Sequence, residues 1–147
     1  MDIDQLREDL ERDEGRVDAV YLDHLGYPTF GIGHLITDDD PEHGSDVDTP
    51  VSDVRVVEAF EQDVQRVCDD CTILFPDFYD LPEEAQLVIA NMMFNMGRTR
   101  LSKFKKFIAA VEDSDWMEAS AQMKDSRWYN QVTNRAQRLR ERIEALA

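Results

Sequence analysis

The sequence predicts an α+β fold in which a small antiparallel β lobe is followed by a larger helical lobe. Over most of the chain, apolar residues recur every three or four positions, which is the period of an amphipathic helix. Between residues 16 and 36 this period gives way to alternation, and three glycines and a proline stand among β-branched and aromatic residues. The length of 147 residues, of which 42% are hydrophobic, suits a single compact domain.

The N-terminal part predicts a helix followed by the β lobe. Ile3, Leu6 and Leu10 lie on one helical face, and Gly15 is a helix stop, so the helix should end beside Glu14. The β lobe is expected over about residues 15–50. Its last stretch, TDDDPEHGSDVDTP, has no periodicity and predicts a surface loop that lacks the ligand spacing of a calcium-binding EF-hand.

A long connecting helix is predicted over about residues 52–73, with Ser52 as its cap. Its apolar stripe consists of Val54, Val57, Phe60, Val64, Val67 and Cys71. Residues 74–147, together with the N-terminal helix, should form the helical lobe.

The helical lobe should centre on an apolar helix that starts at Pro82 and stops at Gly97. An amphipathic helix is predicted around 104–111, another starts after Asp115 as its cap, and a basic one begins at about Asn134.

Composition excludes several function classes. The 32 acidic and 16 basic residues give a net charge of −16, which argues against nucleic-acid binding. No apolar run approaches the roughly 20 residues that span a bilayer, and the charged N-terminus does not resemble a secretory signal, so no membrane insertion is expected. Cys68 and Cys71 form a lone CxxC without further metal ligands nearby, and two reduced thiols are expected.

Three polar residues are candidates for catalysis: Glu14, Asp23 and Thr29. They fall at a helix end, at a strand turn and on a second strand, which should meet where the two lobes join and form a cleft. A glycosidase needs one protonated carboxyl as acid and one ionised carboxyl to activate water. Among 32 carboxylates this pairing alone is weak, and solvated surface acids are the alternative.

Ordered motifs strengthen this hypothesis. The stretches DEGRVDAVYLDHLGYPTFGIGHL (13–35), FEQDV (60–64), NMMFNMG (91–97) and SRWYNQVTNRA (126–136) resemble, in order, segments of the phage-type lysozymes, glycoside hydrolase family 24, the T-even phage endolysin family. The resemblance covers nearly the whole chain. It implies the lysozyme-like fold, with an active-site cleft between the lobes.

The resemblance implies that the protein would be an inverting muramidase, which would cleave the β-1,4 bond between N-acetylmuramic acid and N-acetylglucosamine and lead to host cell lysis. Glu14 matches the general acid, Asp23 the second carboxylate and Thr29 the hydroxyl that helps to place the attacking water. Positions that line the saccharide cleft are matched by Leu35, Phe94 and Gln122, although at Gln122, as at Phe107, this chain departs from the family residue.

The resemblance also implies supporting contacts. His34 and Asp63 match an ion pair, which would raise the pKa of the histidine. Arg135 resembles an arginine that hydrogen-bonds the catalytic glutamate, and Arg138 could pair with Asp13.

Neither metal nor cofactor is expected, and the expected partner is the glycan strand of peptidoglycan, bound by a monomer. We expect the protein to be made in the host cytoplasm and released to the wall through a holin. Two alternatives stay open: a lytic transglycosylase, and an inactive lysozyme-like virion or binding module.

Overall fold

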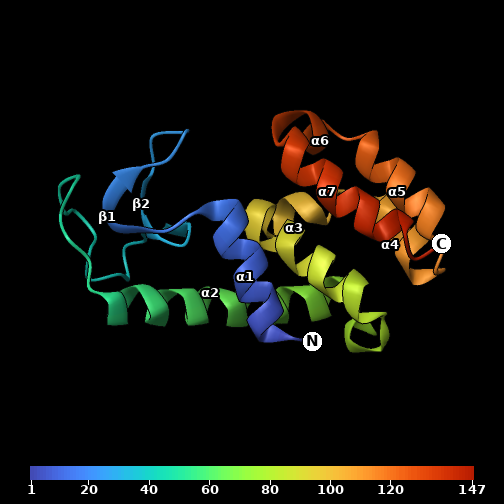
Figure 1. The fold of residues 1–147 in the computed structure, drawn as a ribbon, viewed down its shortest axis with the longest axis horizontal. Coiled ribbons are helices and arrows are strands. Elements are labelled where there is room, and N and C mark those ends of the chain that lie inside the picture. Colours follow the sequence, from blue (N-terminus) through green and yellow to red (C-terminus); the bar gives the residue numbers. More distant parts are fainter. The chain divides into compact units, whose positions relative to one another are not determined.

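The computed structural model describes all 147 residues and confirms the predicted α+β class. Helices and a three-stranded antiparallel sheet follow one another along the chain (Figure 1). The elements are α1 (Ile3–Glu14), β1 (Val17–Leu22), β2 (Pro28–Gly31), β3 (His34–Leu35), α2 (Asp53–Leu74), the 3-10 helix η1 (Phe78–Asp80), α3 (Glu83–Leu101), α4 (Lys105–Glu112), α5 (Trp116–Lys124), α6 (Arg127–Gln131) and α7 (Thr133–Glu144).

The chain divides into two compact units. One comprises residues 7–66 and is called the sheet unit below; the other comprises residues 1–6 and 67–147 and is called the helical unit. Both divisions fall inside helices, in α1 and in α2, so that each of these helices contributes to both units.

The ends of α1 and α2 follow the predicted signals. Gly15 has a φ of 75° and its N–H donates to the Glu11 carbonyl at 2.9 Å, so α1 ends at Glu14. The left-handed backbone suits glycine because it has no Cβ. At the start of α2, the Ser52 hydroxyl accepts the Arg55 N–H at 3.2 Å and satisfies one of the free donors of the first turn.

The sheet unit is built on the strand order β1-β2-β3. Thr29 on the central strand lies opposite Tyr21 on β1 and opposite Leu35 on β3. Residues directly opposite each other point to the same face of a sheet, so these three side chains share one face. Phe30 points to the other face and is fully buried.

The helical unit has its core around α3. The helix is buried on most of its faces, as its nearly uniform apolar sequence predicts. Trp128 on α6 is 2% exposed, and its indole N–H donates to the Asn95 side-chain oxygen at 2.8 Å. Its ring meets Phe104 edge-on, with centroids 6.5 Å apart.

The first helical segment of α3 ends at Gly97, as the sequence predicts. Gly97 has a φ of 79° and a ψ of 165°, which breaks the helical path, but helical turns resume after this kink and continue to Leu101. The new turn is closed by the Ser102 N–H, which donates to the Arg98 carbonyl at 2.8 Å. α3 thus consists of two helical segments, a long one before Gly97 and a short one after it.

The two cysteines are free and buried. Burial raises the pKa of both thiols, since a thiolate is poorly solvated in the core. In no helix is the apolar stretch both long and uncharged enough to cross a bilayer.

Candidate active site

Glu14 is placed by the end of α1 and by the turn between β2 and β3. A Cβ built on Gly33 in that turn would lie 2.6 Å from Glu14 Oε1, so the carboxyl packs directly against the glycine backbone. Gly33 also has a φ of 63°, a backbone conformation that glycine adopts more easily than residues with a Cβ. Because Gly33 in the GIGH stretch has no side chain, it leaves the space that the Glu14 carboxyl occupies, and a larger residue would fill this space.

Asp23 follows β1 and organises the tight turn that leads into β2. Its Oδ1 accepts the backbone N–H of Leu25 at 2.9 Å and that of Tyr27 at 2.8 Å. The Asp23 N–H in turn donates to the Tyr27 carbonyl at 2.9 Å. These bonds fix the carboxyl through one oxygen and leave Oδ2 available to a ligand or water.

Thr29 lies on the central strand and is 4% exposed. Its hydroxyl donates to the Tyr27 carbonyl at 3.0 Å. Because that bond uses the only proton of the hydroxyl, the oxygen lone pairs can still accept a hydrogen bond from a water molecule. The same turn residue, Tyr27, therefore orients both Asp23 and Thr29.

Tyr21 connects the three candidates, and sequence reasoning did not single it out. Partial burial raises the pKa of the Tyr21 phenol, and the negative charges of Glu14 and Asp23 raise it further. The phenol is thus within electrostatic reach of both carboxyls, while its strand neighbour is Thr29. The alternation of Val17, Ala19 and Tyr21 predicted a strand, but it carried no signal for this placement.

His34 and Leu35 are neighbours on β3, so their side chains point to opposite faces of the sheet. The His34 ring lies between two carboxylates. Its Nδ1 is 2.7 Å from Asp63 Oδ2 and its Nε2 is 2.9 Å from Asp40 Oδ2. Burial alone would lower the pKa of His34, but the hydrogen bonds and charges of Asp63 and Asp40 outweigh it and raise the pKa. With both ring nitrogens engaged and 4% exposure, His34 is a structural residue.

A guanidinium extends this cluster to the acidic loop. Arg55 on α2 bonds Asp40 at 3.0 Å and Glu42 at 2.9 Å, and lies 5.5 Å above the ring of Phe30. The loop that the sequence predicted as a solvated segment is therefore tied to α2 at these two residues. The Asp40 partner of His34 was not foreseen, because loop sequence without periodicity does not reveal which carboxylate turns inward.

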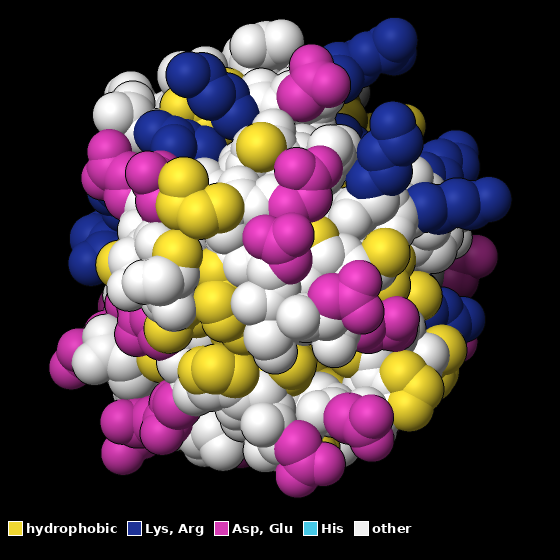
Figure 2. Space-filling model, turned by 90° about the vertical axis from the view of Figure 1, so that its right-hand side faces the viewer, with side chains coloured by type: hydrophobic (Ala, Val, Ile, Leu, Met, Phe, Trp, Pro, Cys, Tyr) yellow, Lys and Arg dark blue, Asp and Glu magenta, His cyan; other side chains and the backbone are white.

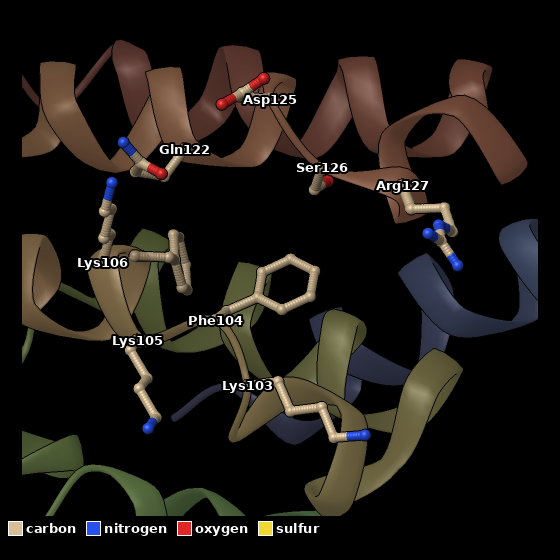
Figure 3. A pocket seen from close by; sticks show the side chains of 9 residues that line it. Lys103, Phe104, Lys105, Lys106, Gln122, Asp125, Ser126 and Arg127 are labelled. Atoms are coloured by element: carbon tan, nitrogen blue, oxygen red, sulfur yellow. The ribbon is translucent and has the colours of Figure 1, made fainter.

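The remaining predicted site residues are distributed over both units. Leu35 in the sheet unit is 50% exposed on the face that carries Tyr21 and Thr29. In the helical unit, Phe94 is half-buried on α3. Gln122 on α5 donates to Glu118 at 2.7 Å and lines a pocket of about 410 Å³ (Figure 3). Their contacts with a saccharide stay predictions.

The two arginines named as supports lie on α7. Arg135 is buried and its Nε donates to the Asn91 side-chain oxygen at 2.9 Å. Arg138 donates to the Asn134 carbonyl at 3.3 Å. The proposed pairings of Arg135 with Glu14 and of Arg138 with Asp13 stay predictions. No group of three or more His, Cys, Asp or Glu side chains is arranged to hold a metal ion.

Comparison with known proteins gives consistent matches. The family described as phage lysozyme matches residues 11–145. Two proteins of Dictyostelium discoideum match along nearly their whole length. Probable T4-type lysozyme 1 is 30% identical, and the match covers 97% of this chain and 95% of that protein. Probable T4-type lysozyme 2 is 28% identical, and the match covers 93% of this chain and 92% of that protein. Peptidoglycan hydrolase gp36 of Pseudomonas phage phiKMV is a longer protein that is 26% identical in the matched region. The match covers 92% of this chain and 15% of gp36.

Proposed function

The chain belongs to the phage lysozyme family and is a glycoside hydrolase, and from this premise we propose that it hydrolyses the β-1,4 bond between N-acetylmuramic acid and N-acetylglucosamine in bacterial peptidoglycan. One relative is itself named a peptidoglycan hydrolase. The observation that supports the proposal is that the sheet unit holds Glu14 against Gly33 and holds Asp23 and Thr29 through the same turn residue, Tyr27. The charges of both carboxyls also raise the pKa of Tyr21, the strand partner of Thr29.

The reaction assigned to these residues is an acid/base displacement. The protonated Glu14 carboxyl donates its proton to the glycosidic oxygen as the bond to the sugar carbon breaks, and positive charge develops on the sugar. A water molecule attacks that carbon from the opposite face. The Asp23 carboxylate accepts the proton of the water through the oxygen that the turn leaves available, and Thr29 accepts the second water hydrogen to orient it.

This assignment makes the enzyme inverting. In such enzymes the two carboxyls stand about 6.5–9.5 Å apart, so that water fits between the second carboxylate and the sugar. Asp23 and Thr29 both serve the water, and a lytic transglycosylase, which closes an anhydro ring without water, would need neither.

The test is product analysis on purified peptidoglycan with Glu14→Gln, and Glu11→Gln as its control. Glu11 is an exposed carboxyl on the same helix, three residues earlier. We expect wild type and Glu11→Gln to yield reducing ends, with inversion visible by NMR of the fresh product, and Glu14→Gln to fold normally without turnover. Anhydro sugars would indicate the transglycosylase, and full activity of Glu14→Gln would remove it as the acid. A folded wild type that binds the glycan without cleaving it would indicate a binding module.

We further propose, on the resemblance of the motifs alone, that the protein acts as a monomer made in the host cytoplasm and released to the wall through a holin. Expression in a bacterial cytoplasm with and without a co-expressed holin tests this. Lysis should require the holin, and lysis at the same rate without it would contradict the proposed route.

A further inference from the structure

A pocket in the helical unit has a charge opposite to that of the chain as a whole. It lies between the start of α4 and the α5–α6 segment, and we call it the α4 pocket (Figure 3). Its volume is about 410 Å³, and its lining residues are Lys103, Phe104, Lys105, Lys106, Phe107, Gln122, Asp125, Ser126 and Arg127. Four of these are cations and one is a carboxylate, in a chain with 32 acidic and 16 basic residues.

The four cations of the α4 pocket are unpaired. No carboxylate or other side chain bonds Lys103, Lys105, Lys106 or Arg127. Elsewhere in the helical unit arginines do find acidic partners: Arg98 pairs with Asp70 at 3.2 Å, and Arg142 pairs with Glu84. Three of these unpaired cations, Lys103, Lys106 and Arg127, border the pocket in Figure 3, and Asp125 is its one carboxylate. In a chain where acids outnumber bases two to one, this excess of positive charge leaves a local positive potential that an external anion can neutralise.

Two of these lysines lie where their charge is unfavourable for the helix that contains them. Lys105 and Lys106 are the first two residues of α4, which has no side-chain cap and no acidic residue in its first turn. Positive charge near a helix N-terminus opposes the helix dipole. The neighbouring α5, by contrast, starts with Asp115 accepting the Glu118 N–H at 3.2 Å. The charges of Lys105 and Lys106 therefore do not stabilise α4 through its dipole.

The side chains surround the pocket from two sides. The ring of Phe104 lies between Lys106, which extends toward Gln122 on one side, and Lys103 with Arg127 on the other, whereas Lys105 points away (Figure 3). Figure 2, which views the molecule from the α4 and α5 side, shows most of the Lys and Arg on the upper half of this face, with some Asp and Glu among them, and mainly Asp and Glu on the lower half. An anion that reaches the pocket is therefore drawn by cations of separate segments.

We propose that the α4 pocket binds a phosphate group. A phosphate group presents oxygens in a tetrahedral arrangement, so it can meet cations on both sides of the pocket, whereas the two oxygens of a carboxylate lie in one plane. The source is either free phosphate or the headgroup of an anionic lipid. In the second case the pocket would hold an otherwise strongly acidic protein at a phosphate-bearing surface, where its net charge of −16 alone would repel it.

The test measures binding of inorganic phosphate by titration calorimetry at low ionic strength, with sodium acetate as the comparison anion. The pocket variant is Lys103→Gln with Lys106→Gln. The control variant, Arg100→Gln with Lys124→Gln, removes two charges from exposed residues of the same unit that do not line the pocket. We expect wild type and control to bind phosphate equally, and the pocket variant to bind it roughly fivefold more weakly or worse.

Thermal unfolding provides a second readout. Without phosphate, the single variant Lys106→Gln should melt at or above the wild-type temperature, because a charge that opposes the helix dipole has been removed. With phosphate, the melting temperature should rise in wild type and less in the variant. A drop in melting temperature without phosphate would assign Lys106 to the fold and overturn the argument.

Flotation with vesicles separates the two sources. Retention on phosphatidylglycerol but not on phosphatidylcholine vesicles, reversed by inorganic phosphate, would identify the lipid headgroup, and binding of inorganic phosphate without retention would identify free phosphate. Equal affinity for acetate and phosphate at matched ionic strength, or equal binding by pocket and control variants, would overturn the proposal. All of these measurements read binding, so their failure leaves the proposed hydrolysis unaffected.

Discussion

Replacing Gly33 by alanine separates the positioning of Glu14 from the stability of the fold. Two effects are expected from the structure. The φ of 63° is costly for any residue with a Cβ, by about 1–2 kcal/mol. The new Cβ would also stand 2.6 Å from Glu14 Oε1, so the carboxyl must retreat by roughly 0.8 Å to reach an ordinary contact of 3.4 Å. Since that oxygen ends a flexible side chain, the retreat adds little to the loss of stability but moves the proton donor.

Gly44→Ala is the matched control. Gly44 has a φ of 82° in the same unit, and nothing lies within 4 Å of an added Cβ. Both variants should therefore lose about 1–2 kcal/mol in the free energy of unfolding, measured by urea titration. Only Gly33→Ala should lose activity, by about 100-fold in kcat on purified peptidoglycan, which is typical of a misplacement of about 1 Å.

Two results would refute this reasoning. If Gly33→Ala kept wild-type kcat while its stability fell, the activity of Glu14 would not depend on its close contact with Gly33. If Gly44→Ala lost as much activity as Gly33→Ala, the loss would come from backbone strain in the sheet unit rather than from the contact with Glu14.

Three further predictions follow from burial and charge. Because Asp63 and Asp40 raise the pKa of His34, the stability that this cluster contributes should be complete below the unfolded pKa of about 6.5 and be lost as pH rises through the higher folded pKa. The urea midpoint of unfolding, measured across this pH range, should fall accordingly. If His34→Asn showed the same dependence of the urea midpoint on pH as wild type, this assignment would be contradicted. Trp128→Ala should reduce the free energy of unfolding by about 3–5 kcal/mol, since the ring is 2% exposed, and a loss below 1 kcal/mol by urea titration would exclude a core role. Because the chain carries a net charge of −16, turbidity assays on intact cell walls should show activity rising as salt increases from very low values, whereas a monotonic fall would argue against repulsion.

Local patterns in the sequence were sufficient for much of the fold. The stripe of α1 and the glycine after it predicted a helix that ends at Glu14, and Ser52 predicted the start of α2. Such signals act over three or four residues, so a single sequence contains them in full. Gly97 likewise marked the end of the first segment of α3, but its local signal did not show that a short second segment follows it.

For the site, the sequence alone determined the candidates Glu14, Asp23 and Thr29, through motifs whose order and spacing are written along the chain. Only the tertiary structure decided which groups surround them: Tyr21 within reach of both carboxyls, Gly33 under Glu14, Asp40 rather than another acid of its loop beside His34, and four cations left unpaired at the α4 pocket. The physical reason is the separation along the chain over which each kind of interaction acts. Helix and turn signals are local, whereas electrostatic and steric contacts depend on distances that arise only when segments far apart in the chain pack together.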